Sequence, residues 1–259
     1  DECGSCWAFT SIANIESAYL IHNKTGERHF DLSEQEILAC AKPNGCKGGT
    51  GADAYKYMIR REGIARETTL PYKAKDNECP KQERLGKAAA IEDYCMRGKY
   101  VKLNGRQEVL NDEEIMFIVR EYGPIYTTIH IDDATMKHYK TGVYDNDNCS
   151  KQTNHAVTIV GWDEQSWIIK NSWGTNWGRK GYLYLPRGQN KCGINQIIGI
   201  AFGNSTRHHN RKNSNKNEND KNKDKDKNKD EDKNKDEDKN HDHSHRHHHH
   251  HHYPIVIVN

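Results

Sequence analysis

The chain has 259 residues, a formal net charge of +2 and eight cysteines. The length suits one or two domains with additional sequence, and a charge so close to balance does not indicate nucleic acid as a partner. No apolar run approaches the roughly 18 residues that a membrane span requires, so we expect no membrane insertion.

The first predicted element is a helix that begins at Cys6. Apolar residues recur at helical spacing over residues 7–20 without Gly or Pro, Thr25-Gly26 ends the run, and Ser5 is suitable as an N-cap. The unpaired N–H groups and the dipole at a helix N-terminus favour negative charge, which stabilises a thiolate. We therefore interpret Cys6 as a candidate nucleophile in the first turn of a buried helix.

Other interpretations of Cys3 and Cys6 stay open at this point. The Cys-x-x-Cys pair is also typical of a redox site or of half a zinc site, and one of its cysteines can belong to a structural disulfide. A redox pair in a thioredoxin-like fold needs a strand just upstream, and a zinc site needs a second closely spaced pair, which Cys40 and Cys46 match loosely.

Two further patterns follow in the first half of the chain. Residues 32–38 predict a helix start, with Ser33 and Glu36 as a capping box and Leu32 and Ile37 as a hydrophobic staple. Residues 45–49 are rich in Gly, which indicates either a tight turn or a close approach of the backbone to another group. A short amphipathic helix over residues 52–59 ends at Gly63.

After Pro71-Tyr72 the chain becomes rich in predicted strands. A helix over 112–122 is stopped by Gly123-Pro124. Strands are predicted over residues 125–131, 155–162, 166–170, 181–185 and 197–202. Helices first and strands later predict an α+β fold.

Two motifs lie where a catalytic Cys near the start would need its partners. His155 stands in Asn-His-Ala-Val-Thr-Ile-Val-Gly-Trp, and Asn171 stands in Lys-Asn-Ser-Trp-Gly. His155 follows Cys6 by 149 residues, within the roughly 130–150 typical of papain-type enzymes, and Asn171 follows it by 165, slightly beyond that range. With these motifs and Cys-Gly-Ser-Cys-Trp-Ala-Phe, the chain resembles the papain-like cysteine proteases over residues 1–202, and the cathepsin L branch most closely.

The resemblance implies a two-lobe fold and a role for each motif residue. A helical left lobe would span about residues 1–90 and an antiparallel β-barrel-like right lobe about 91–202, with the active-site cleft between them. Cys6 would attack the peptide bond, His155 would exchange the proton, Asn171 would orient His155, and Trp173 would shield their hydrogen bond. Taken singly, His155 could be an ordinary strand histidine, and Trp173 and Trp177 could simply pack between elements.

The resemblance also implies the substrate contacts. Gly49 would pair with the substrate backbone like an added strand. Residues expected to contact substrate are Gly48, Gly49, Thr50, Ile129, Asn154, Ala156, Trp173 and Ile197. The pocket for the second residue before the scissile bond (P2) would be lined by Thr50, Gly51, Ile129, Thr153, Ala156 and Ile197. The small or apolar side chains of this pocket predict a bulky apolar P2 residue. No His-rich insertion follows Gly49, which favours an endopeptidase over a dipeptide-releasing enzyme.

The cysteines and the start of the chain complete these expectations. The resemblance pairs Cys3 with Cys46, Cys40 with Cys79, and Cys149 with Cys192. Cys95 stands in a context similar to one in mite group 1 allergens, and we expect its partner upstream of Asp1. The sequence has no initiating Met, signal peptide or prosegment, so we expect a mature region truncated at its N-terminus, with the family's oxyanion Gln just before Asp1 and correspondingly low activity.

Residues 203–259 are expected to be disordered, because alternating Asn, Lys, Asp, Glu and His cannot form a core. The histidines of residues 241–252 could bind divalent metal or form an expression tag, and the apolar end over 253–259 could be a sorting signal. A metal-binding protein carried by this tail is therefore one rival hypothesis.

The function we predict is a thiol protease without cofactor or catalytic metal. Its expected partners are peptide substrates, cystatin-like inhibitors and its own prosegment, and we expect a monomer. Eight cysteines and sequons at Asn23, Asn148 and Asn204 favour a disulfide-bonded glycoprotein that is secreted or lysosomal or vacuolar. The other rival is an inactive homologue that keeps the fold.

Overall fold

The computed structural model describes residues 3–23, 30–98, 102–103, 106–107, 109–147 and 149–203. The helices are α1 (Cys6–Asn23), α2 (Glu34–Cys40), α3 (Gly51–Arg61) and α4 (Asp112–Tyr122), with short 3₁₀ turns η1 (Gly45–Lys47), η2 (Gln82–Arg84), η3 (Met136–His138) and η4 (Lys191–Gly193). The strands are β1 (Asp93–Gly98), β2 (Lys102–Leu103), β3 (Arg106–Gln107), β4 (Ile125–Ile129), β5 (His155–Trp162), β6 (Ser166–Lys170), β7 (Tyr182–Pro186) and β8 (Ile197–Phe202). The expected helix end at Thr25-Gly26, the sequons at Asn148 and Asn204, and the tail over 204–259 lie outside these residues.

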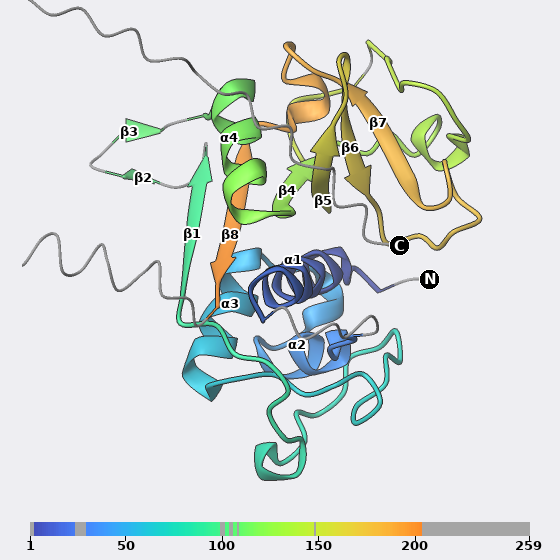
Figure 1. Cartoon of the computed structure of the whole chain (residues 1–259). Helices are drawn as coiled ribbons and strands as arrows, with labels where there is room; N and C mark the ends of the chain where they lie inside the picture. Colours follow the sequence, from blue (N-terminus) through green and yellow to red (C-terminus); the bar gives the residue numbers. More distant parts are fainter. Residues whose placement is uncertain are drawn as a thin grey trace, which may run out of the picture. The chain divides into compact units, whose positions relative to one another are not determined.

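Six of the strands form one antiparallel sheet in the order β1-β8-β4-β5-β6-β7. In Figure 1 the helices α1, α2 and α3 gather in the lower half, and α4 lies with most of the sheet in the upper half. The long strands β1 and β8 run between the two halves. Helices together with an antiparallel sheet confirm the predicted α+β class.

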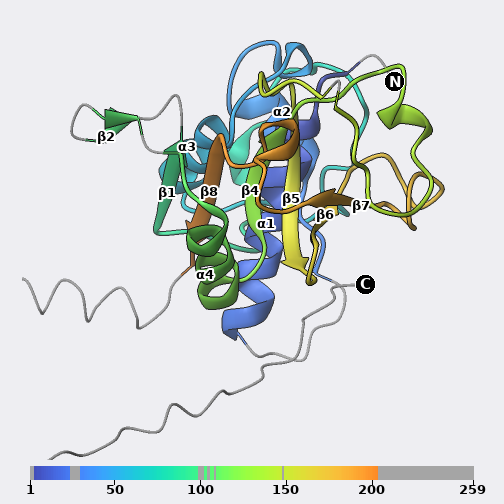
Figure 2. The same ribbon diagram turned by 90° about the horizontal axis from the view of Figure 1, so that it is seen from above.

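Helix α1 connects the helices to the sheet. Its Trp7, Ala8, Ile12 and Ile15 are almost completely buried. In Figure 2 the helix extends alongside β4 and β5, and it contacts both strands. A long apolar helix without Gly or Pro therefore becomes the element on which the rest of the fold packs.

The buried Asn14 of α1 holds three segments together. Its Nδ2 donates to the carbonyl oxygen of Pro124 at 2.6 Å. Its Oδ1 accepts from the Tyr55 hydroxyl at 2.8 Å and from the Ala201 N–H at 3.1 Å. Because Asn14 is only 1% exposed, each of these polar groups depends on it in place of water.

The start of α2 corrects one sequence expectation. Ser33 Oγ accepts from the Glu36 N–H at 3.0 Å, so half of the predicted capping box forms. The Glu36 carboxylate instead turns inward, where it lies 2.7 Å from Arg61 Nε and accepts from the Tyr57 hydroxyl and the Ala65 N–H. A buried ion pair with Arg61 therefore replaces the cap contact, since an unpaired buried charge is costly.

Complete capping boxes occur at two other helices. Thr50 and Asp53 cap α3, and Asn111 and Glu114 cap α4, each by a reciprocal pair of side-chain and backbone hydrogen bonds. The cap at Thr50 fixes where α3 begins, and with it the position of the Gly-rich segment just before the helix.

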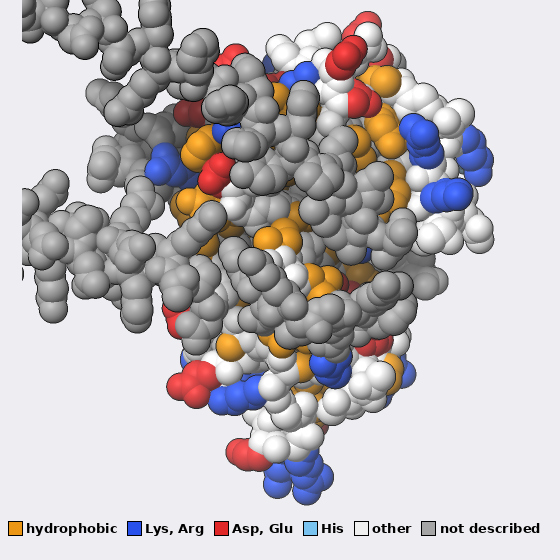
Figure 3. Space-filling model, viewed as in Figure 1, with side chains coloured by type: hydrophobic (Ala, Val, Ile, Leu, Met, Phe, Trp, Pro, Cys, Tyr) orange, Lys and Arg blue, Asp and Glu red, His pale blue; other side chains and the backbone are white. Residues whose placement is uncertain are grey.

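The apolar side chains form two cores. One contains residues of α1, α2 and α3, including Trp7, Leu38 and Met58. The other contains residues of α4 and the sheet, including Ile115 and Trp167. None of the described helices is both long and apolar enough to cross a bilayer. On the face in Figure 3 acidic and basic side chains are interspersed, in keeping with the near-balanced charge of the sequence.

The structure joins Cys3 to Cys46, Cys40 to Cys79, and Cys149 to Cys192, which are the pairs that the resemblance implies. Cys6 and Cys95 are the free cysteines among the described residues, and both are half-buried. The expectation of an upstream partner for Cys95 stays a prediction.

Candidate active site

Cys6 is the first residue of α1. The Ser5 carbonyl accepts the first helical hydrogen bonds, from the N–H groups of Ala8 and Phe9. The Ser5 hydroxyl does not serve as the expected cap but forms a 2.6 Å hydrogen bond with the Tyr72 hydroxyl. Its position leaves the unpaired N–H groups of the first turn beside the Cys6 sulfur.

Two opposing effects act on the Cys6 thiol. Burial raises its pKa, because a thiolate loses hydration there. Hydrogen bonds from the backbone N–H groups of Ala156, Trp7 and Cys6 itself act in the opposite direction. Helix α1 packs on β5, the strand that begins with His155 and Ala156, and the Ala156 N–H is among the groups that act on the thiol.

His155 is held by Asn171, the residue that follows β6. The His155 Nε2 and Asn171 Oδ1 atoms are 2.8 Å apart, and both residues are buried. The same Oδ1 accepts from the Ser172 N–H at 2.8 Å, which fixes the orientation of the amide. Because an amide oxygen only accepts, Nε2 must carry a proton, and in the neutral ring Nδ1 is then the basic nitrogen.

The surroundings of His155 restrain its charge and its ring. Burial lowers the pKa of His155, and the hydrogen bond to Asn171 raises it. The Trp173 ring lies 5.1 Å from the imidazole, centroid to centroid, and stacks edge-on against Trp177 at 5.0 Å. Trp173 thus packs against the imidazole, and Trp177 packs against Trp173.

The family model described as papain family cysteine protease matches residues 1–202. The chain belongs to the papain family of cysteine proteases. It is 36% identical to pro-cathepsin H of Mus musculus over 203 residues, and 38% identical to ananain of Ananas comosus over 201 residues. These matches cover 74% of this chain but 56% and 53% of the relatives, so the chain spans about half the length of the curated relatives it matches.

Solved structures of papain-family proteases have the same fold. The bromelain protease of Ananas comosus, in complex with the E64 inhibitor, matches with a TM-score of 0.67 and 34% identity. The match covers 78% of this chain and 90% of that one. A Carica candamarcensis cysteine protease in complex with E-64 matches with a TM-score of 0.68 and 27% identity over 79% of this chain and 91% of that one.

In this papain-family chain the Gly-rich segment packs on the first turn of α1. A Cβ atom on Gly49 would lie 2.6 Å from the Trp7 ring, so only glycine fits there. Gly48 has φ +100°, which also favours glycine. Across the described chain, neither the N–H nor the carbonyl of Gly49 has a hydrogen-bond partner. The Gly49 backbone is therefore open to an extended peptide.

Several predicted substrate residues surround the start of β5. Ala156 contacts the Cys6 sulfur through its N–H, and the exposed Asn154 precedes His155. Thr50 is exposed at the start of α3, Thr153 is half-buried, and Ile197 is half-buried at the start of β8. Trp173 is half-buried beside His155.

Ile129 is a correction to the predicted set. It is 0% exposed and belongs to the core between α4 and the sheet. Side chains alternate across a strand, so its neighbour Thr128 faces the helices instead. Thr128 pairs with Ala156 in the sheet, and its Oγ1 donates to Thr153 Oγ1 at 3.0 Å.

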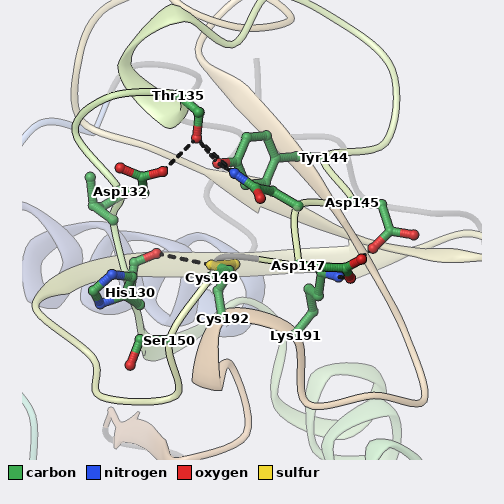
Figure 4. The surroundings of a disulfide bond; sticks show 12 residues. His130, Asp132, Thr135, Tyr144, Asp145, Asp147, Cys149, Ser150, Lys191 and Cys192 are labelled. Carbon is green, nitrogen blue, oxygen red and sulfur yellow. Dashed lines mark hydrogen bonds and ion pairs between the residues drawn. A yellow bond between two sulfur atoms is a disulfide. The ribbon is translucent and has the colours of Figure 1, made fainter.

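The loop before His155 is tied to η4 by the Cys149–Cys192 disulfide, shown in Figure 4. Beside it, Lys191 Nζ lies 2.5 Å from Asp145 Oδ1 and 3.1 Å from Asp147 Oδ1. The ion pairs raise the pKa of Lys191. The loop that carries Asn154 toward His155 is thereby fixed to the segment that leads into β8.

Sequence reasoning missed an acidic cavity behind Asn171. It has a volume of about 240 Å³, and its lining includes Glu16, Glu34, Lys170 and Asn171. Burial raises the pKa of Glu16 to about 7 and that of Glu34 to about 8. The sequence signal that could have indicated this cavity was Glu16, a charged residue within the apolar run of α1. Within the described part of the chain, no three potential ligands gather in a way that would hold a metal ion.

Proposed function

We propose that the chain is a cysteine endopeptidase that hydrolyses peptide bonds through a thioester, with Cys6 as nucleophile, His155 as general acid and base, and Asn171 as the residue that orients His155. One observation carries the proposal. Asn171 holds His155 Nε2 and so leaves Nδ1 as the basic nitrogen, and the free thiol of Cys6 begins the helix that packs on β5, the strand that His155 begins.

In the proposed mechanism His155 Nδ1 takes the Cys6 proton, and the sulfur attacks the scissile carbonyl carbon. The C–N bond breaks as the imidazolium protonates the leaving amine, which leaves a thioester on Cys6. A water molecule, deprotonated by His155, then attacks the thioester carbonyl carbon. The C–S bond breaks, the acyl part of the substrate leaves as a carboxylic acid, and the imidazolium returns its proton to the sulfur. Burial disfavours each charge alone, so the reactive thiolate–imidazolium pair would depend on the mutual attraction of its two members.

Substrate would bind as an added strand on the open backbone of Gly49, with Asn154 on the opposite side. The P2 side chain would then enter between Thr50 and Gly51 on one side and Ala156 and Ile197 on the other. The apolar character of Ala156 and Ile197 supports a bulky apolar P2 residue.

The same proposal includes the organisation of the protein. Residues 1–90 would form the left lobe and 91–202 the right lobe, and the two cores support this division. Cystatin-like inhibitors and the protein's own prosegment would bind the same site. A monomer in a secreted, lysosomal or vacuolar compartment is proposed, supported by the disulfides and by the cathepsin and plant-protease relatives.

Labelling with the epoxide inhibitor E-64 tests the proposal. We expect one equivalent of E-64 to attach to Cys6, and the labelled protein no longer to cleave a fluorogenic peptide. Cys6→Ala should abolish both labelling and cleavage, whereas Cys95→Ala, which removes the other free cysteine, should retain both.

Two outcomes would contradict the proposal. Labelling that persists in Cys6→Ala would place the reactive thiol elsewhere. Stoichiometric labelling of Cys6 without cleavage of any peptide in a broad library would favour the inactive homologue.

A further inference from the structure

Rows of paired residues cross the sheet on the face toward α1 and α3. In the first row, Thr128 of β4 pairs with Ala156 of β5, and the β4–β8 register brings Thr128 next to Ile197. In the next row, Tyr126 pairs with Thr158 on one side and with Gly199 on the other. The two rows are separated by two residues along β4, or about 6–7 Å.

The first row lies at the level of the nucleophile. Ala156 contacts the Cys6 sulfur, and Thr128 contacts Thr153. This row therefore forms the part of the proposed P2 site that the sheet contributes. The second row lies one step deeper, where a P2 side chain pointing inward from Cys6 would arrive.

Tyr126 fills the second row. It is 2% exposed, and its ring carbon Cε2 lies 3.1 Å from the position of a Cβ atom on Gly51. On the other side, a Cβ atom on Gly199 would lie 3.1 Å from the Tyr126 Cβ and 2.5 Å from Met96 Sδ. The glycine on α3 thus leaves the space that the phenol ring occupies, and the glycine on β8 leaves room beside the Tyr126 Cβ for Met96.

The hydroxyl of Tyr126 marks the inner end of this space. The Gly51 backbone and the Cys6 thiol act on the ionisation of this hydroxyl in opposite directions. Burial, followed by the proximity of Cys6, raises the pKa of Tyr126, so the phenol stays neutral. Because the ring is buried and lies against the first residue of α3, it forms a wall between β4 and that helix.

We infer that Tyr126 is a specificity-determining residue that closes the inner end of the P2 site, so that branched aliphatic P2 residues fit and aromatic ones do not. The inference rests on the proposed function, which it makes narrower. Val, Leu and Ile would reach as far as the ring, whereas the longer side chains of Phe and Tyr would require Tyr126 to move.

The test compares fluorogenic peptides that share a P1 Arg and differ at P2. For the wild-type protein we expect kcat/KM with P2 Leu or Val to exceed that with P2 Phe by about fivefold or more, as expected when a pocket is too short for a side chain. Tyr126→Val, which keeps a β-branched residue on the strand, should shift this ratio toward Phe by about tenfold or more. Tyr126→Phe, which preserves the ring, should keep the ratio within about twofold of wild type.

The outcomes separate the inference from the proposed function. A wild-type protein that E-64 labels and that cleaves P2 Phe peptides as well as P2 Leu peptides would overturn the role of Tyr126 alone. The same holds if Tyr126→Val folds, is titrated by E-64 and keeps the wild-type ratio. If Tyr126→Val does not fold, the wild-type P2 profile decides. A wild-type protein with neither labelling nor cleavage would instead overturn the proposed function.

Discussion

The hydrogen bond between His155 and Asn171 determines which ring nitrogen is available for proton transfer. Asn171 Oδ1 is an acceptor shared between His155 Nε2 and the Ser172 N–H. The bond to Asn171 raises the pKa of His155 against the effect of burial. Asn171 therefore acts on both the orientation and the basicity of the imidazole, and its removal has a distinctive expected result.

We expect Asn171→Ala to lower kcat by about 10²-fold, because general acid–base catalysis by a misoriented His155 loses most of its contribution. Loss of the hydrogen bond should also lower the pKa of His155 further, so the alkaline limb of the kcat/KM profile should move to lower pH. A pH–rate profile from pH 4 to 9 measures both effects.

Asn171→Gln is the matched variant, because it keeps the amide but displaces its oxygen. It should recover part of the activity of Asn171→Ala and part of the shift in the alkaline limb. An unchanged pH–rate profile in Asn171→Ala would mean that the hydrogen bond between His155 and Asn171 does not affect proton transfer by His155.

At this scale the sequence was informative wherever chemistry is carried by a short motif. Cys6, His155 and Asn171 were each predicted from their neighbours in the chain. The assignment of Ile129 to the P2 pocket was wrong because predicting that a segment is a strand does not show which face of the sheet each side chain points to. A shift of one residue exchanges the two faces. Tyr126 was missed because its surroundings, Gly51 and Gly199, come from distant segments.

Among the elements, those with strong local signals were predicted most accurately. The bounds of α4, β5, β6 and β8 agree with the prediction. For α4 the signal was complete, because its helical spacing lies between the Asn111 cap and Gly123-Pro124. The strand β4 ends at Ile129 instead of Ile131, because Ile131 bonds to the Asn154 side chain. The inward orientation of the Glu36 side chain was not predicted, because it depends on Arg61, which lies at the end of α3 and 25 residues later in the chain.

The most consequential contact between elements is the one through Asn14. We expect Asn14→Ala to reduce the free energy of unfolding by about 2–4 kcal/mol, because it leaves the Tyr55 hydroxyl, the Ala201 N–H and the Pro124 carbonyl buried without a partner. Urea denaturation followed by tryptophan fluorescence measures the change.

Lys56→Ala, at an exposed position of α3, is the control and should change stability by less than about 0.5 kcal/mol. An Asn14→Ala variant no less stable than this control would show that other groups or water take over the three hydrogen bonds.

For the molecule as a whole, the acidic cavity predicts a dependence of stability on pH. The pKa values of Glu16 and Glu34 rise from 4.5 to about 7 and about 8 on burial, so the folded state favours their neutral forms. Their contribution to stability is therefore fully present below about pH 4.5 and is lost as the pH rises through 7 and 8. This direction is suited to a protein that works in an acidic compartment.

We expect the double variant Glu16→Gln, Glu34→Gln to lose less stability than wild type between pH 5 and pH 8, with a difference on the order of 1–3 kcal/mol. Urea midpoints at both pH values measure it, and because wild type and variant share every other titrating group, the comparison isolates the cavity. Glu113→Gln, at an exposed position, should follow wild type. If wild type and the double variant lose the same stability between pH 5 and pH 8, the pH dependence arises from other groups.

The Cys3–Cys46 disulfide and the 2.7 Å hydrogen bond from the Gly4 N–H to the Cys46 carbonyl fasten the residues just before the nucleophile to the Gly-rich segment. A reductant added to keep Cys6 in its thiol form can also attack this bridge by exchange. Too little reductant leaves the Cys6 sulfur oxidised and unreactive. Too much reductant opens the Cys3–Cys46 disulfide, which fastens the residues before Cys6 to the Gly-rich segment. The usable reductant concentration for this protein therefore has a lower limit, set by oxidation of Cys6, and an upper limit, set by reduction of the disulfide at Cys3, three positions earlier in the chain.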